Sequence, residues 1–149
     1  MKKKLAILGK LDTKFNAPFD DPNYDIWAFN LHSDENQIKR VDVWFDIHTH
    51  EWVNPKAIIK RDNFPFDECH KLVGGHYFNN TVSYLIALAI LKGYKEIELY
   101  GMRFNSGEEV RKQEYNNVRE LIFFAKGRGI KITAPYDPIM LKEYPLYGI

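Results

Sequence analysis

Cysteine is nearly absent from this sequence, which contains a single one, Cys69, in 149 residues. One thiol forms no internal disulfide, and it makes no zinc site without several other ligands. The residues around Cys69 also show no pattern typical of cysteine catalysis. We therefore expect an ordinary thiol in a reducing compartment, which predicts a cytoplasmic protein.

The chain also lacks an excess of charge of either sign. Lysine and arginine together number 21, aspartate and glutamate number 20, and the formal net charge is +1. A protein dedicated to DNA or to a membrane surface needs a patch of one sign. The charge balance therefore favours neither of these partners.

Long hydrophobic runs are missing as well. The basic start of the chain is followed by only four apolar residues, Leu5 to Leu8, which are too few for a signal peptide and are typical of a strand. The longest apolar stretch lies around Leu85 to Leu91 and is far shorter than a membrane span. The sequence therefore predicts no membrane segment.

What the chain has is enough apolar material for one core. Hydrophobic residues make up 45% of the sequence and aromatic residues 15%, which excludes global disorder. The length is typical of one domain, and no repeat or linker interrupts it, so we expect a single domain over residues 1–149. The many aromatic side chains also suggest a subunit interface, and hence a homo-oligomer.

Short apolar segments alternate with two helical patterns. Strands are expected at Leu5–Leu8, Asp25–Phe29, Val41–Asp46, Ala57–Ile59, Glu96–Tyr100 and Ile130–Thr133. Helices are expected at Thr81–Lys92 and Glu109–Lys126, each ended by a glycine, and a short helical turn at Pro138–Glu143. The rest of the Asn54–Gly75 stretch reads as a loop broken by proline. The alternation predicts an α/β fold, a Rossmann-like three-layer sandwich with a mostly parallel sheet.

Sheets of this kind bind ligands outside the carboxyl ends of their strands. The candidate ligand-contacting residues follow the predicted strands or begin the first predicted helix: Gly9, Lys10, Asn30, Asp46, His48, Gly101, Arg103 and Thr81. Helix N-termini suit phosphate, and arginine is its natural side-chain partner. Gly9-Lys10 has the spacing of neither a P-loop nor a dinucleotide fingerprint. Strand-ending turns, and capping by Asn79, Asn80 and Thr81, explain the same residues without a ligand.

Four chemically capable side chains fall within six residues, namely Asp46, His48, His50 and Glu51. Asp46 and His48 are candidates for a catalytic acid–base pair, since histidine titrates near neutral pH. His48 and His50, two residues apart on an extended strand, would also reach a metal ion together, with Glu51 or Asp46 adding oxygen. A strand end whose polar residues meet water is the third interpretation.

Three segments, Thr81–Ile90, Gly93–Ile97 and Leu99–Phe104, resemble the core of the bacterial CMP-sialic-acid-dependent sialyltransferases of glycosyltransferase family 42. They look still more like a group of small uncharacterised tailed-phage proteins that share this core. In those proteins the chain ends in stretches like Lys126–Ile130 and Leu146–Gly148. The resemblance implies a Rossmann-like fold with a nucleotide site.

In the sialyltransferases, positions like Gly9, Asn30, Asp46 and Thr81 line that nucleotide site. Asp46 stands where the transferases have an asparagine. The transferases also use a histidine base and tyrosines in a longer lid. Here only Glu108 to Tyr115 is available for such a lid, and no histidine follows His76.

The tailed-phage proteins differ from this chain too. They usually carry an aspartate where Arg103 stands, and a Gln-Arg pair near Glu114 and Tyr115. The resemblance therefore implies the fold and a nucleotide site more than a particular reaction.

The leading hypothesis is a phage-type protein that binds a nucleotide or nucleotide-sugar, as a reduced glycosyltransferase. In it Gly9 and Thr81 hold phosphates, Asn30 holds the base or ribose, and Asp46 and His48 face the reacting group, while Arg103 offsets negative charge. Two alternatives are a non-enzymatic nucleotide-sequestering protein and a small metal-assisted hydrolase that uses His48 and His50 with Glu51. A structural protein with a vestigial site is the fourth.

Overall fold

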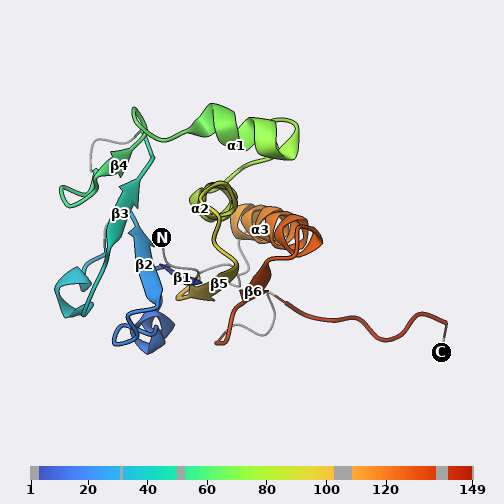
Figure 1. The fold of residues 1–149 in the computed structure, drawn as a ribbon, viewed down its shortest axis with the longest axis horizontal. Helices are drawn as coiled ribbons and strands as arrows, with labels where there is room; N and C mark the ends of the chain where they lie inside the picture. Colours follow the sequence, from blue (N-terminus) through green and yellow to red (C-terminus); the bar gives the residue numbers. More distant parts are fainter. Residues whose placement is uncertain (1–3, 31, 50–52, 103–108, 137–140, 149) are drawn as a thin grey trace.

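Six parallel strands form one sheet in the order β4-β3-β2-β1-β5-β6 (Figure 1). The computed structural model describes residues 4–30, 32–49, 53–102, 109–136 and 141–148. The strands are β1 (Lys4–Leu8), β2 (Tyr24–Phe29), β3 (Val43–Asp46), β4 (Ile59–Lys60), β5 (Glu96–Tyr100) and β6 (Lys131–Thr133).

Helices cover one face of this sheet and shorter elements cover the other. The helices are α1 (Phe66–Val73), α2 (Thr81–Leu91) and α3 (Glu109–Gly127), with 3-10 helices η1 (Asp12–Asn16) and η2 (Glu35–Gln37). All three α-helices lie on the same side of the sheet in Figure 1. On the opposite face, Ala6 and Leu8 of β1 pack with Ala17 and Phe19, just after η1. The result is the expected α/β fold, with one thin layer.

Helix α2 is the centre of the larger core. All of its residues from Leu85 to Ile90 are buried, which is the pattern of a helix enclosed on every side. It contacts α1 on one side and α3 on the other. The chain leaves α2 through Gly93, whose φ of +86° is the left-handed backbone that commonly ends a helix.

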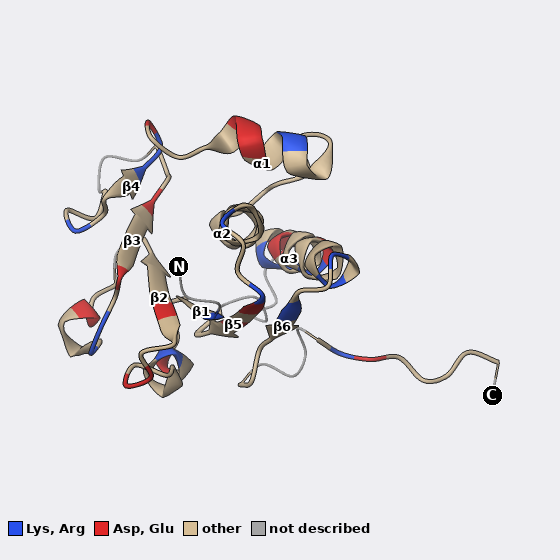
Figure 2. Cartoon of the chain, viewed as in Figure 1, with Lys and Arg blue, Asp and Glu red and all other residues tan. Residues whose placement is uncertain are grey.

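Helix α1 corrects the sequence-based expectation of a loop in this region. Pro65 precedes the first helical residue, where proline is tolerated, so it starts a helix and does not break one. Asp67 and Glu68 in the first turn and Lys71 in the last complement the helix dipole, and Figure 2 shows red at the start of α1 and blue near its end. Cys69 is buried on the inner side of α1.

Other boundaries differ slightly from prediction. The strand expected at Ala57–Ile59 lies at Ile59–Lys60, where it pairs with Phe45 and Asp46 of β3. Gly127 is the last residue of α3, and Gly129 takes the left-handed conformation instead. Residues 138–140 of the helical turn predicted at Pro138–Glu143 lie outside the described residues, and the described remainder, 141–143, is not helical.

The order of the strands creates a switch point. The chain builds the sheet outward from β1 to β4, then crosses back to place β5 on the free side of β1. Connections therefore leave β1 and β5 in opposite directions, which opens a crevice at their carboxyl ends. Within the described residues, no helix is both long and apolar enough to cross a membrane.

Candidate functional site

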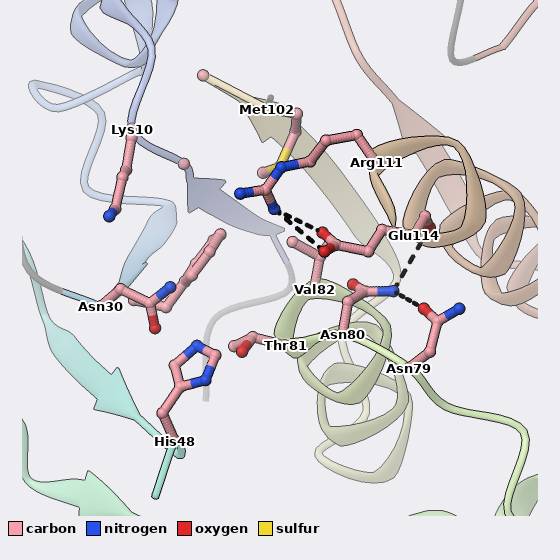
Figure 3. Close-up of a pocket in the computed structure, with 13 residues that line it drawn as sticks. Lys10, Asn30, His48, Asn79, Asn80, Thr81, Val82, Met102, Arg111 and Glu114 are labelled. Atoms are coloured by element: carbon pink, nitrogen blue, oxygen red, sulfur yellow. Dashed lines mark hydrogen bonds and ion pairs between the residues drawn. The ribbon is translucent and has the colours of Figure 1, made fainter. Parts of the chain in front are cut away.

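A pocket lies at this switch point, outside the carboxyl ends of β1, β2 and β5. It is lined by Gly9, Lys10, Phe29, Asn30, His48, Asn79, Asn80, Thr81, Val82, Gly101, Met102, Arg111 and Glu114. In Figure 3, Lys10 and Asn30 lie on one side, and Arg111 and Glu114 lie on the other. The pocket thus brings together most of the residues that follow the predicted strands.

Two glycines let the ends of β1 and β5 meet at the base of the pocket. A Cβ atom on Gly9 would lie 2.3 Å from the carbonyl oxygen of Gly101, which is impossible without moving the backbone. Gly101 itself has a φ of +68°. The amide of Leu11 donates to the carbonyl of Gly101, and the amide of Gly101 donates to Thr13 Oγ1. Strand packing alone therefore explains both glycines, and a role for them in ligand binding stays a prediction.

Asn30 is the most unusual residue of the site. Its φ of +64° is the only positive value among the described residues other than glycine. Its backbone is fixed, because its amide donates to the carbonyl of Phe45 and its carbonyl accepts from Asn54 Nδ2. Its side-chain Oδ1 is buried and has no hydrogen-bond partner among the described residues. Strained backbone and an unsatisfied buried acceptor are both features of functional sites.

Asp46 lies behind the pocket and is not among the residues that line it. Its side chain is fully buried, and its two oxygens accept from the amides of His48 and Asn54. Asn54 in turn donates to Glu35 Oε2 at 3.1 Å. In these contacts Asp46 fixes the backbone at His48 and at Asn54. Its predicted catalytic role with His48 stays a prediction.

His48 itself lines the pocket, on the side opposite α3. The hydrogen bond from its amide to Asp46 fixes the backbone from which the ring projects. Among the described residues that line the pocket, it is the one histidine, so its imidazole is the best-placed candidate there for an acid or base.

The N-terminus of α2 forms the floor between these two sides. Asn80 is the N-cap, and its Oδ1 accepts from the amide of Ser83 at 3.0 Å. The two residues between them, Thr81 and Val82, line the pocket. Ordinary capping is thus confirmed for Asn80, and the same helix end presents the positive end of its dipole to the pocket.

Arg111 and Glu114 form an ion pair at the remaining side. Arg111 Nη1 lies 3.1 Å from Glu114 Oε1 and 3.0 Å from Oε2. Neither residue was among the candidates predicted from the sequence. The signal that was available is the three-residue spacing of the pair on one face of α3, whose start the fold brings to the strand ends.

Three predicted residues cannot be placed. Arg103, His50 and Glu51 lie outside the described residues. Among the residues that the structure does describe, no group of three or more histidine, cysteine, aspartate or glutamate side chains is arranged to hold a metal ion. The metal site that includes His50 and Glu51 is therefore untested.

The chain is similar in fold to solved structures of a sialyltransferase. CstII from Campylobacter jejuni, in complex with the substrate analogue CMP-3FNeuAc, has a TM-score of 0.55 at 16% sequence identity, over 92% of this chain and 81% of that chain. The same enzyme with cytidine-5'-monophosphate gives 0.51 at 17% identity, over 90% and 81%. A mutant of α-2,3/8-sialyltransferase CstII gives 0.52 at 17% identity, over 91% and 82%.

No family model matches the chain, and no curated protein sequence matches it. At these identities, the likeness to the solved structures shows the fold alone. This chain therefore has a Rossmann-like fold of the sialyltransferase type.

Proposed function

We propose that this chain binds a cytidine nucleotide or a CMP-sugar in the pocket at the switch point. The observation that carries the proposal is Asn30, a pocket-lining residue on a strained backbone whose Oδ1 is buried and has no partner among the described residues. The amino group of a cytosine, or a ribose hydroxyl, would supply the missing donor. The proposal is supported by the fold, which is that of enzymes solved with CMP and with a CMP-sugar analogue.

The phosphate would bind between the N-terminus of α2 and the two cationic side chains. Thr81 and Val82 offer the helix end, while Lys10 and Arg111 approach from opposite sides. With Glu114 included and histidine neutral, the charged side chains that line the pocket sum to +1. One net positive charge suits the single negative charge of a phosphodiester, which is the linkage in a CMP-sugar.

A reduced glycosyltransferase is the finer form of this proposal. His48 would act as the acid or base beside the sugar, and the helix end with Arg111 would stabilise the charge of the departing phosphate. Arg103, which the sequence predicts to offset negative charge, would help to stabilise that phosphate. The predicted origin in a tailed phage, the single domain, the cytoplasmic location and the homo-oligomer belong to the same proposal.

Binding without turnover is the second candidate. Among the described residues that line the pocket, the side chains of the usual acid–base types are His48 and Glu114, and Glu114 is engaged by Arg111. This shortage of acid–base groups favours a protein that sequesters a nucleotide.

Calorimetric titration with CMP, a CMP-sugar, UMP and AMP tests the proposal. We expect CMP and the CMP-sugar to bind at one site, and AMP to bind more weakly because its larger base presents a different edge. Incubation with the CMP-sugar and sugar acceptors then separates the two candidates, since release of CMP indicates transfer and tight binding without release indicates sequestration. No heat with any nucleotide would overturn both.

A further inference from the structure

Lys14 is a buried cation outside the pocket lining. Its side chain is 1% exposed, although lysine is almost never fully buried without partners. It lies in η1, the short helix that follows β1 on the thin side of the sheet.

Three acceptors surround the Lys14 ammonium group. Its Nζ atom lies 3.2 Å from the carbonyl oxygen of Lys10, 2.9 Å from His32 Nδ1 and 2.5 Å from Asp34 Oδ1. An ammonium group only donates, so His32 Nδ1 accepts and the ring carries its proton on Nε2. That proton is donated to the carbonyl of Phe29, at 3.0 Å.

These contacts reach the pocket from behind. Lys10 and Phe29, whose carbonyls accept these bonds, both line the pocket. Lys10 follows β1, and Phe29 is the last residue of β2. Thr13, the neighbour of Lys14 in η1, accepts from the amide of Gly101 after β5. One short helix therefore connects the carboxyl ends of the three strands that form the pocket.

We propose that Lys14 is a positioning residue, whose buried ammonium group holds the loop after β1 and the end of β2 at the separation at which the pocket binds its ligand. The inference rests on the proposed nucleotide site. Lys14 does not touch the ligand, and it acts through the backbone of Lys10 and, by way of His32, through the backbone that precedes Asn30.

The chemistry of the network supports this role over simple stabilisation. Replacing a buried ion pair by apolar side chains is often neutral or stabilising, so burial of Lys14 with Asp34 is weak support for stability. The ammonium group is itself fixed by three acceptors, and it holds the carbonyl of Lys10 directly and that of Phe29 through His32. It therefore fixes the orientation of the backbone at two residues that line the pocket. Apolar packing at the same place would leave that spacing looser.

The test compares Lys14→Met with Tyr94→Phe. Methionine keeps much of the lysine stem but removes the charge and the three donors. Tyr94→Phe removes the bond from Tyr94 to Asp25 at the opposite ends of the strands, so it serves as a control for loss of stability. Affinity for CMP is measured by calorimetry well below the melting temperature of either variant, where both are folded.

We expect Lys14→Met to weaken CMP binding about tenfold, because a site that is not preorganised must order itself on binding, and Tyr94→Phe to leave the affinity unchanged. Equal affinity of wild type and Lys14→Met would overturn the inference while leaving the nucleotide site intact. Absence of CMP binding to wild type would instead overturn the proposed function.

A double-mutant cycle gives a readout that a purely structural role would not move. If Lys14 acts through the placement of the Asn30 side chain, the loss of CMP affinity caused by Lys14→Met becomes smaller in the Asn30→Gly background. Fully additive losses would contradict the proposed route through Asn30. Should Lys14→Met not fold, Asp34→Asn weakens the same network from its more exposed end, and unchanged affinity of that folded variant would also overturn the inference.

Discussion

At the residue scale, one substitution of Asn30 distinguishes its effect on stability from its effect on ligand binding. Glycine adopts a φ of +64° without strain, so Asn30→Gly removes the amide and relieves the backbone together. We expect the free energy of unfolding to stay equal or to rise by up to about 1 kcal/mol, while CMP binding weakens. Urea denaturation and calorimetry measure the two effects. A variant that is less stable and binds CMP as wild type does would contradict the role of Asn30.

His32 makes the stability of the fold depend on pH. Burial lowers the pKa of His32 below its usual 6.5, and the neighbouring Lys14 ammonium lowers it further. Lys10 lowers this pKa by a smaller amount, while the hydrogen bond to Phe29 and the charge of Asp34 raise it. The unfolded chain takes up a proton near pH 6.5 and the folded chain does not. Stability is thus fully present above that pH and is lost as the pH falls below it.

Urea denaturation from about pH 7.5 to about 5.5 checks this expectation, with a slope from His32 of at most about 1.4 kcal/mol per pH unit. NMR titration of the His32 ring gives the pKa directly. A value at or above 6.5 would contradict the buried, neutral ring that accepts from Lys14.

At the scale of single elements, α2 depends on its cap. Asn80→Ala removes the acceptor for the Ser83 amide and the donors to Ser83 Oγ and Asn117 Oδ1. We expect a loss of about 1 kcal/mol or more in the free energy of unfolding, measured by urea denaturation. Asn80→Ser keeps a capping oxygen and serves as the matched control. Equal losses in the two variants would show that the cap is not the cause.

The junction of β1 and β5 is the other sensitive element. Gly101→Ala places a Cβ atom 2.8 Å from the carbonyl oxygen of Leu11 and 2.9 Å from that of Gly9, on a left-handed backbone. Gly129→Ala has a similar φ of +81° but nothing within 4 Å.

We expect Gly129→Ala to lower the free energy of unfolding by about 1 kcal/mol. Gly101→Ala should lower it by about 2 kcal/mol more, because only Gly101→Ala displaces the backbone after two strands. Equal costs in denaturation would show that the close approach of β1 and β5 is not tight.

The long, strongly patterned elements were the ones that the sequence predicted well. In α2 and β5, apolar spacing and the closing glycines set the boundaries to within one residue. Helix α1 was missed, because Pro65 and the surrounding loop residues hide a helix whose burial depends on packing against α2. The 3-10 helix η1 has too few residues to leave a periodic pattern.

At the scale of the whole molecule, topology explains why the candidate site was partly predictable. Carboxyl ends of parallel strands share one edge, so residues after the strands, such as Lys10, Asn30 and His48, were expected to gather there. The contribution of α3 was not predictable in this way. Arg111 and Glu114 reach the pocket only because the crossover after β5 brings the start of α3 over the strand ends.

The burial of Asp46 and the network around Lys14 also required the structure. Nothing in the spacing of Lys14, His32 and Asp34 shows that η1 folds back against the end of β2. Charged residues in such short connections are ordinarily solvated, and here the thin layer on the second face of the sheet encloses them.

An NMR titration of the labelled protein with CMP, following every backbone amide, locates the nucleotide site. We expect shifts concentrated at the residues that line the pocket, namely Gly9, Lys10, Asn30, His48, Thr81 and Gly101. Amides at the opposite end of the sheet, near Lys95 and Ile130, should not move. Shifts centred on that opposite end, or none at all, would contradict a nucleotide site at the switch point.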